Sequence, residues 1–576
     1  MGARARRLLV GLLVLAGTLP LLGPNPAVGA GDPARVRIPQ LYLDQELTWS
    51  PCDFDYYLRT LYPGAPATNC ASIVVPMDWR HPDAHPDITL SIALSRGTGR
   101  SRGLLTLNPG GPGVPAVDNT ALFATARPRM FADFDLLGFD PRGFGQSSRA
   151  RCSASSRELE ALPLVPDRRV RNPATHRAEV APAQLAARAC AGEELNPFVG
   201  TEQTVHDLEF LRAYLSARQG PGATSYDKLN YIGYSYGTWL GAWYADTYPE
   251  HTGRFVLDSN LDWTASQYAN QASDSASFQR RRDQMFFPWV ARHARSYGLG
   301  RTPAAVRRSY ERIRAGVLRS YRAGLSPVSA EDLDADLLLL LYTDDGFAEA
   351  AVTLVDYAQL AQPATVGADA ARRRTLAAAA EDDEELQPSQ VVRCNDSAYS
   401  RDIPATLRRT DRDARRYPFV GYWNSVSMCN YWSFPSSTRR IDLTGAPVLL
   451  MLQSEGDPAA AYEGALAAHR ATAAHTRLVS VDDGGQHGLY LSGVSPCVER
   501  LADRFLFDGQ LPRTDTTCAS RPLPGDTKVY PLAGPVVLTR PAAAGSSAGP
   551  TGPRAPATAR AVVRDLQRRV AEQESR

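Results

Sequence analysis

The stretch that most constrains this chain is residues 228–241, K-L-N-Y-I-G-Y-S-Y-G-T-W-L-G, which places Ser235 at the centre of a G-x-S-x-G pentapeptide. An apolar run leads into the glycine-flanked serine, and a helical pattern follows it. This order is typical of a nucleophile elbow, a sharp strand-to-helix turn whose glycines let the two elements approach closely and leave the serine hydroxyl exposed. The pentapeptide also occurs by chance in long chains, so its meaning depends on the rest of the sequence.

Short apolar runs and helical patterns alternate on both sides of this elbow. Two β-rich runs at 71–75 and 88–94 predict an antiparallel hairpin at the edge of a sheet. The remaining alternation predicts an α/β fold in which a mostly parallel sheet carries helices on both faces. The expected strands are 104–107, the start of 135–147, 229–233, 254–258, 447–452 and 477–481, and the expected helices among them are 205–217, 239–248 and 462–474.

Two polar residues follow the later strands directly. Asp457 comes after the strand at 447–452, and His487 lies in a glycine-bearing loop after 477–481, which we expect to be the last strand. The chain order Ser, Asp, His is the one found in α/β hydrolases. We therefore expect Ser235 to be the nucleophile, His487 its general base and Asp457 the carboxylate that orients the imidazole. Glu455 and Asp482 are alternatives for the acid, and Asp457 could instead cap a helix.

A glycine-rich loop, N-P-G-G-P-G at 108–113, follows the first buried strand. Backbone of this kind can approach an oxyanion, which acyl-transfer enzymes hold with two backbone N–H groups. Gly111 and Tyr236 are the residues expected to supply them, and a plain Gly/Pro turn is the alternative. In the next loop, Asp140 and Arg142 are expected to form a structural ion pair or hydrogen bonds that hold the oxyanion loop, and substrate contact is the other interpretation.

Residues 149–217 read as a surface connection that leads into the helix at 205–217. From about residue 263 to 418 helical patterns dominate, which predicts a helical cap inserted between two strands and placed over the site. An acidic run at 381–385 within it is expected to be a solvated face. The expected domains are a first core part at 31–262, the cap at 263–418 and a second core part at 419–535.

The two ends of the chain differ from this core. Arg4, Arg6 and Arg7 precede an apolar run at 8–22, and small residues at 28–30 offer a cleavage site. We expect a secretory signal peptide at 1–30, cleaved after Ala30, and hence a secreted, extracellular protein with no later membrane span. Residues 536–576 are a Pro/Ala/Gly-rich linker and a short amphipathic segment, either a mobile tail or a docking element.

Eight cysteines in an exported chain indicate disulfides, because that compartment is oxidising and no C-x-x-C motif is present. Sequence neighbours are the expected pairs, with free buried thiols as the alternative. These pairs are Cys52 with Cys70, Cys152 with Cys190, Cys394 with Cys429, and Cys497 with Cys518. The net charge of +2 gives no electrostatic footprint for nucleic acid, and we expect no metal and no cofactor.

The chain contains N-P-G-G-P-G, D-P-R-G-x-G-x-S, G-Y-S-Y-G-T-W-L-G and R-F-V-L-D-S-N-L-D-W, together with the loops of Asp457 and His487. Taken together, these motifs resemble the secreted tripeptidyl aminopeptidases of actinomycetes. These belong to the prolyl-aminopeptidase-like serine peptidases of the α/β-hydrolase superfamily. The resemblance covers about residues 71–518 and implies a serine exopeptidase that removes short peptides, typically tripeptides, from free N-termini of peptides and proteins. One departure is Asn108 at the start of the glycine loop, where relatives commonly have His.

An aminopeptidase must also bind the substrate ammonium, which calls for carboxylates at a fixed distance from the nucleophile. The sequence offers four candidates and does not choose among them: Asp344, Asp345, Glu349 and Asp396. Two other functions remain open. A carboxylesterase could use the same catalytic groups on the same scaffold, and a catalytically inactive binding protein could retain the fold.

Overall fold

The computed structural model describes residues 35–218, 226–361 and 388–536. The expected signal peptide at 1–30, the acidic run at 381–385 and the amphipathic segment of the tail lie outside the described residues. None of the helices within the described ranges is both long enough and apolar enough to cross a bilayer.

One sheet of ten strands organises the molecule, in the order β1-β2-β3-β5-β4-β6-β7-β8-β9-β10. The strands β1 to β3 pair antiparallel, β3 also pairs antiparallel with β5, and the remaining neighbours from β5 to β10 are parallel. This topology confirms the expected α/β-hydrolase fold. The strands are β1 (Ser50–Pro51), β2 (Thr68–Pro76), β3 (Asp87–Ser95), β4 (Leu104–Asn108), β5 (Asp135–Phe139), β6 (Leu229–Tyr234), β7 (Thr252–Asp258), β8 (Leu449–Ser454), β9 (Thr476–Asp482) and β10 (Thr516–Ala519).

The central strands are covered on both faces. Every residue of β4, β5, β6 and β8 is buried, as expected for parallel strands that read as continuous apolar runs. One apolar cluster packs α7 and α8 against the sheet, and a second packs α3, α4 and α19. The helices of the sheet layers are α1 (Gln40–Asp44), α2 (Asp55–Leu61), α3 (Asn119–Ala124), α4 (Arg129–Asp133), α7 (Thr201–Ala217), α8 (Tyr236–Thr247), α18 (Tyr462–Ala471) and α19 (Pro496–Asp508), with 3₁₀ turns η1 (Asn196–Phe198) and η2 (Pro249–His251).

The expectation that the strand before His487 ends the sheet is wrong. β10 adds a further parallel strand beside β9, with Cys518 opposite Val481. Its four residues, T-T-C-A, are too short and too polar to stand out as a strand, and the disulfide to Cys497 in α19 attaches it to the fold. The two-residue β1 beyond β2 was likewise not expected.

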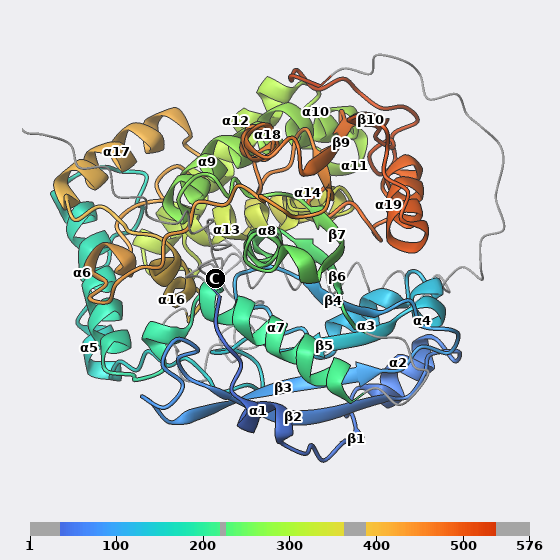
Figure 1. Cartoon of the computed structure of the whole chain (residues 1–576). Coiled ribbons are helices and arrows are strands. Elements are labelled where there is room, and N and C mark those ends of the chain that lie inside the picture. Colours follow the sequence, from blue (N-terminus) through green and yellow to red (C-terminus); the bar gives the residue numbers. More distant parts are fainter. Residues whose placement is uncertain (1–34, 219–225, 362–387, 537–576) are drawn as a thin grey trace, which may run out of the picture.

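Helices fill the chain between β7 and β8, in the stretch proposed as a cap. Those from α9 to α14 share their own apolar cluster, whereas Val391 and Val392 of α16 pack into the cluster of the sheet. Figure 1 shows α9, α12 and α13 on one side of the sheet together with α6, α16 and α17. These helices are α9 (Gln267–Arg280), which continues into a π-helical turn η3 (Arg281–Phe286), then α10 (Phe287–Arg292), α11 (Ala294–Tyr297), α12 (Pro303–Arg322), α13 (Ala330–Leu340), α14 (Gly346–Leu360), α16 (Pro388–Asp396) and α17 (Ile403–Arg416), followed by the 3₁₀ turn η5 (Met428–Tyr431).

Residues 149–217 are more than a surface connection. They contain α5 (Ser156–Glu160) and the 19-residue helix α6 (Pro173–Ala191), which joins the cap helices. Asn172 caps α6 by accepting the N–H groups of Ala174 and Thr175, and Pro173 occupies the first helical position, so the local sequence encodes the start of this helix.

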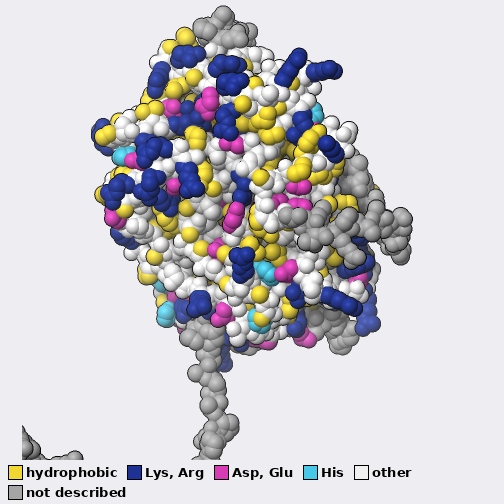
Figure 2. Space-filling model, turned by 90° about the horizontal axis from the view of Figure 1, so that it is seen from above, with side chains coloured by type: hydrophobic (Ala, Val, Ile, Leu, Met, Phe, Trp, Pro, Cys, Tyr) yellow, Lys and Arg dark blue, Asp and Glu magenta, His cyan; other side chains and the backbone are white. Residues whose placement is uncertain are grey.

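The two faces of α17 have different roles. On the inner face, Asp411 accepts hydrogen bonds from Arg171 at 2.7 Å and from His176 of α6 at 3.0 Å. Figure 2 shows basic side chains gathered on the left of the view, the side on which α17 lies in Figure 1. The exposed arginines of this helix are Arg408, Arg412, Arg415 and Arg416. These arginines give the outer face of α17 a positive charge, although the net charge of the whole chain is only +2.

All four expected cysteine pairs are confirmed as disulfides: Cys52–Cys70, Cys152–Cys190, Cys394–Cys429 and Cys497–Cys518. The second and third join segments around α6, α16 and η5. They therefore tie together the part of the cap that lies next to the candidate site.

Candidate active site

Ser235 lies on a strained turn between β6 and α8. Its backbone has φ 53° and ψ −122°, a left-handed conformation that is uncommon for a residue with a side chain. A Cβ atom at Gly233 would lie 2.4 Å from the carbonyl oxygen of Gly237, and one at Gly237 would lie 2.6 Å from that of Asn108. Glycine at both positions is thus required by close backbone approach. The geometry is that of a nucleophile elbow.

His487 and Asp457 are in direct contact. The imidazole Nδ1 lies 2.8 Å from Oδ1 and 3.1 Å from Oδ2 of Asp457, whose side chain is fully buried. A proton on Nδ1 leaves Nε2 as the basic nitrogen, which is the tautomer a general base needs. Oδ1 of Asp457 also accepts the N–H groups of Ala459 and Ala460, so the carboxylate holds its own loop as well.

The alternative acid Glu455 has a different environment. Its two oxygens accept the backbone N–H groups of Val536 and Asp483, at 2.9 and 3.1 Å. Glu455 therefore holds two loop segments, whereas Asp457 holds the histidine. Ser235, Asp457 and His487 follow β6, β8 and β9, which are parallel strands of one sheet, so all three leave the sheet at the same edge.

Asp258, at the end of β7, connects the elbow with the histidine loop. Its carbonyl oxygen accepts the N–H of Ser235 at 3.0 Å. Its carboxylate accepts the N–H of Leu489 at 3.0 and 2.9 Å and that of Tyr490 at 2.7 Å. Burial raises the pKa of Asp258 to about 7. The strand was expected from the sequence, but the role of this side chain was not, because its partners lie more than 200 residues away.

We expect Asp258→Asn to lower kcat/KM about 10- to 100-fold, because one acceptor oxygen becomes an amide NH2 group, a donor that faces a backbone N–H donor. Esterase and peptidase turnover and the rate of labelling by a fluorophosphonate should fall together. Asp246→Asn is the matched control, since Asp246 also accepts two backbone N–H groups, those of Asp442 and Leu443. It should lower the melting temperature without slowing labelling. If Asp258→Asn does the same, the side chain has no positioning role.

The glycine loop has the backbone expected of an oxyanion loop. Gly110, Gly111 and Gly113 have φ values of 113°, 105° and 93°. Oδ1 of Asn108 accepts the N–H of Gly110 at 3.0 Å, so the asparagine shapes the loop internally. Tyr236 begins α8, where N–H groups have no acceptor within the helix and favour negative charge. Gly111 and Tyr236 remain the proposed donors.

Helix α16 of the cap contacts Gly111 directly and is linked to Tyr236 through Thr201. Nη2 of Arg393 donates to the carbonyl oxygen of Gly111 at 2.6 Å. Asp396 accepts the N–H and the Oγ1–H of Thr201 at 2.8 and 2.5 Å, and Oγ1 of Thr201 is in turn hydrogen-bonded to the hydroxyl of Tyr236. Burial raises the pKa of Asp396 to about 7. The cap is therefore joined to the residues proposed to form the oxyanion hole.

The expected pair of Asp140 and Arg142 is only partly right. Asp140 does fix the loops, since it accepts the N–H groups of Ala116 and Val117 after the glycine loop and that of Gln146. Arg142, however, forms its buried ion pair with Asp207 of α7, with both contacts at 2.7 Å. The two side chains leave the same turn toward different partners, and neither is placed for substrate contact by these bonds.

The four ammonium candidates lie in two parts of the cap, three around the start of α14 and one at the end of α16. Asp344 is buried and pairs with Arg281 at 2.8 Å, and its backbone N–H donates to Gln486, next to His487. Asp345 is exposed and pairs with Arg521 at 2.9 Å. Glu349 is exposed in the first turn of α14, and Asp396 accepts from Thr201. The structure does not bring these four carboxylates together.

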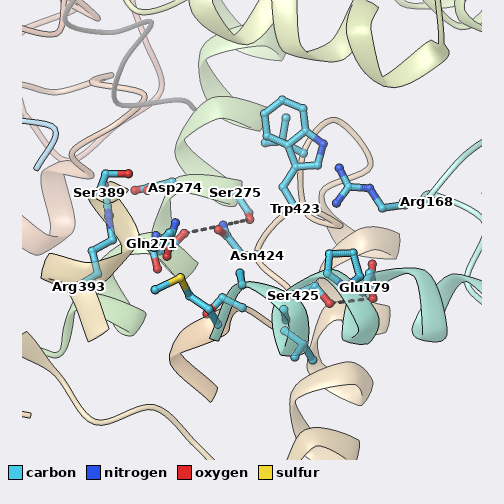
Figure 3. A pocket seen from close by; sticks show the side chains of 18 of the residues that line it. Arg168, Glu179, Gln271, Asp274, Ser275, Ser389, Arg393, Trp423, Asn424 and Ser425 are labelled. Atoms are coloured by element: carbon cyan, nitrogen blue, oxygen red, sulfur yellow. Dashed lines mark hydrogen bonds between the residues drawn. The ribbon is translucent and has the colours of Figure 1, made fainter. Parts of the chain in front are cut away.

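A cavity of about 530 Å³ lies within the cap, and Figure 3 shows it from close by. Its wall comes from α6, α9, α13, α16 and the segment 420–428. Two wall residues also contact the candidate site. Arg393 donates a hydrogen bond to the carbonyl oxygen of Gly111. The ring of Tyr342 lies edge-on to the His487 ring, with centroids 5.3 Å apart, and the carbonyl oxygen of Tyr342 accepts the backbone N–H of His487 at 2.9 Å. No local pattern in the sequence indicates this wall, because it is assembled from five distant segments.

Comparison with known proteins agrees with this geometry. A family model described as TAP-like protein matches residues 417–518. The chain is 30% identical over 499 residues to the tripeptidyl aminopeptidase of Streptomyces lividans, which covers 83% of this chain and 87% of that protein. It is 28% identical over 544 residues to the serine protease Hip1 of Mycobacterium tuberculosis, covering 89% and 98%. It is also 27% identical over 530 residues to carboxylesterase B of the same species, covering 88% and 96%.

The three relatives match over most of both chains, and the topology and the serine elbow are those of a hydrolase. The protein belongs to the tripeptidyl aminopeptidase family, and it is a serine peptidase built on the α/β-hydrolase fold.

Proposed function

We propose that this protein is a secreted exopeptidase that releases short peptides, tripeptides by expectation, from free N-termini through an acyl-enzyme on Ser235. The observation that carries the proposal is the 2.8 Å contact between His487 and Asp457 at the sheet edge where the Ser235 elbow also lies. A histidine held by a buried carboxylate near such an elbow is the arrangement that activates a serine.

The catalytic steps follow from these positions. Nε2 of His487 accepts the hydroxyl proton as Oγ of Ser235 attacks the carbonyl carbon of the scissile bond, and Asp457 stabilises the imidazolium. The N–H groups of Gly111 and Tyr236 donate to the oxyanion. His487 then gives its proton to the departing amine. Water, deprotonated by His487, attacks the acyl-enzyme, which frees the N-terminal peptide as a carboxylate and restores the hydroxyl of Ser235.

Two observations support the finer parts of the proposal. The relative from Streptomyces lividans is named a tripeptidyl aminopeptidase, which supports release of tripeptides. The four disulfides suit an oxidising compartment, which supports export together with the signal-like residues 1–30. The proposed substrates are accordingly peptides and proteins outside the cell.

Ester hydrolysis is the second candidate, because one relative is named carboxylesterase B and the same groups cleave esters. The two functions differ in what binds beside the reacting carbonyl. A peptidase acting on free N-termini needs a partner for the substrate ammonium, whereas an esterase does not.

A panel of chromogenic anilides carrying one, two or three residues, each with a free and an acetylated N-terminus, separates these functions. We expect the free tripeptide anilide to have the highest kcat/KM, because the ammonium contributes binding energy only when it is unblocked. A short-chain nitrophenyl ester assayed beside the panel reports the catalytic groups alone. Ester turnover without cleavage of any anilide would show that the peptidase proposal is wrong.

A further inference from the structure

The cavity in the cap is positioned to receive the part of a peptide that precedes the scissile bond. Its wall residue Arg393 donates to Gly111 of the proposed oxyanion loop, and its wall residue Tyr342 packs on His487. Through these two side chains the cavity adjoins both the proposed oxyanion loop and the histidine loop. Its volume of about 530 Å³ is within the range of pockets that bury a small organic ligand.

Two carboxylates face this cavity, Glu179 from α6 and Asp274 from α9. Figure 3 draws Asp274 on one side, with Ser389 and Arg393, and Glu179 on the other, with Arg168. A carboxylate that receives a substrate ammonium must present oxygen atoms to the cavity in a geometry that adds a charge-assisted hydrogen bond. The position and the exposure of each side chain therefore matter.

Glu179 already serves the cap itself. Its oxygens accept from both terminal nitrogens of Arg171, at 2.5 and 2.8 Å, and from the hydroxyl of Ser425 at 2.8 Å. A buried bidentate pair of this kind balances the charge and fixes the carboxylate. Glu179 joins α6 to the segment 420–428, and an ammonium at this carboxylate would displace one of its bonds.

Asp274 lies on a polar face of α9 that looks into the cavity. Gln271 and Ser275, also on the wall, are three residues before it and one after it, so the three side chains share one side of the helix. Asn424 fixes this face, since its amide donates to the carbonyl of Gln271 at 2.5 Å and to Oγ of Ser275 at 2.9 Å. Asp274 is half-buried, which allows a substrate to reach it while solvent screening is reduced.

We propose that this cavity is the binding site for the N-terminal residues of the peptide substrate, and that Asp274 receives the substrate ammonium. Arg393 acts at the same site as a donor to the peptide carbonyls while it holds Gly111. This assignment rests on the proposed exopeptidase function. It differs from the four candidates that the sequence offered, because the sequence predicted the cap but did not indicate which of its side chains line the cavity.

The test compares Asp274→Asn with wild type on one tripeptide anilide, free and acetylated at its N-terminus, and on a nitrophenyl ester. We expect kcat/KM for the free peptide to fall about 10- to 100-fold, mainly through KM, because a hydrogen bond to a charged group is lost. Turnover of the acetylated peptide and of the ester should change less than about threefold, since neither carries the ammonium.

Asp356→Asn is the matched control, because Asp356 is an exposed carboxylate on α14 of the cap. It should leave all three rates unchanged, and both variants should keep the wild-type fluorophosphonate labelling rate, which reports an intact catalytic site. If wild type prefers free N-termini and Asp274→Asn retains that preference, or loses all three substrates equally, the assignment of Asp274 is wrong and the peptidase proposal stands. If wild type turns over the ester alone, the proposed function and this assignment both fail.

Discussion

Replacing Ser235 with alanine is expected to reduce kcat on both peptide anilides and esters about a millionfold, to the residual level that substrate binding and the oxyanion donors sustain. The substitution removes only the hydroxyl group, and alanine adopts the positive φ of this turn about as readily as serine does. The fold should therefore persist. A fluorophosphonate, which reacts with an activated serine, should label the wild type and leave the variant unmodified.

The control for this experiment is Ser296→Ala, which removes an exposed hydroxyl from α11 of the cap. It should retain full turnover and full labelling. Both variants should melt at the wild-type temperature, because neither hydroxyl supports a buried hydrogen bond that the structure describes. Labelling of the Ser235→Ala protein, or turnover within tenfold of wild type, would mean that another residue is the nucleophile.

The parts of the site that sequence predicts are those determined by neighbouring residues. Gly233 and Gly237 are needed because neighbouring backbone carbonyls leave no room for a Cβ atom at either position. Both glycines lie within the five residues of the G-x-S-x-G pattern, so the sequence alone reveals them. Asp457 and His487 each follow an apolar run by a few positions. The ends of parallel strands meet at one edge, so a local pattern at each strand end is enough to place these residues near one another.

The remaining features depend on pairs that are distant in the chain. Arg142 pairs with Asp207 across 65 residues, and Arg393 reaches Gly111 across 282. Neither partner can be chosen from local composition, because many arginines and carboxylates are available in a chain with 63 basic and 61 acidic residues. The cavity wall is subject to the same limit. Only the packing of α6, α9 and α16 decides which of these charged side chains face a substrate.

Removing the carboxylate that orients His487 is expected to cause the second large loss of kcat. Asp457→Asn is expected to reduce kcat about ten-thousandfold on peptides and esters alike. An amide N–H facing Nδ1 favours the tautomer whose proton lies on Nε2, so the imidazole can no longer accept the proton of Ser235. The amide oxygen can still accept the N–H groups of Ala459 and Ala460, which should preserve the loop and the melting temperature.

Glu455→Gln tests the alternative acid on the same strand end. Glu455 accepts the backbone N–H groups of Val536 and Asp483, so its amide should lower stability while kcat changes less than about tenfold. The labelling rate with a fluorophosphonate distinguishes the two roles, since it depends on activation of Ser235 and not on substrate binding. Slow labelling in Asp457→Asn with near-normal labelling in Glu455→Gln is the expected result. The reverse order would assign the acid to Glu455, and it would require the loop after β8 to rearrange when substrate binds.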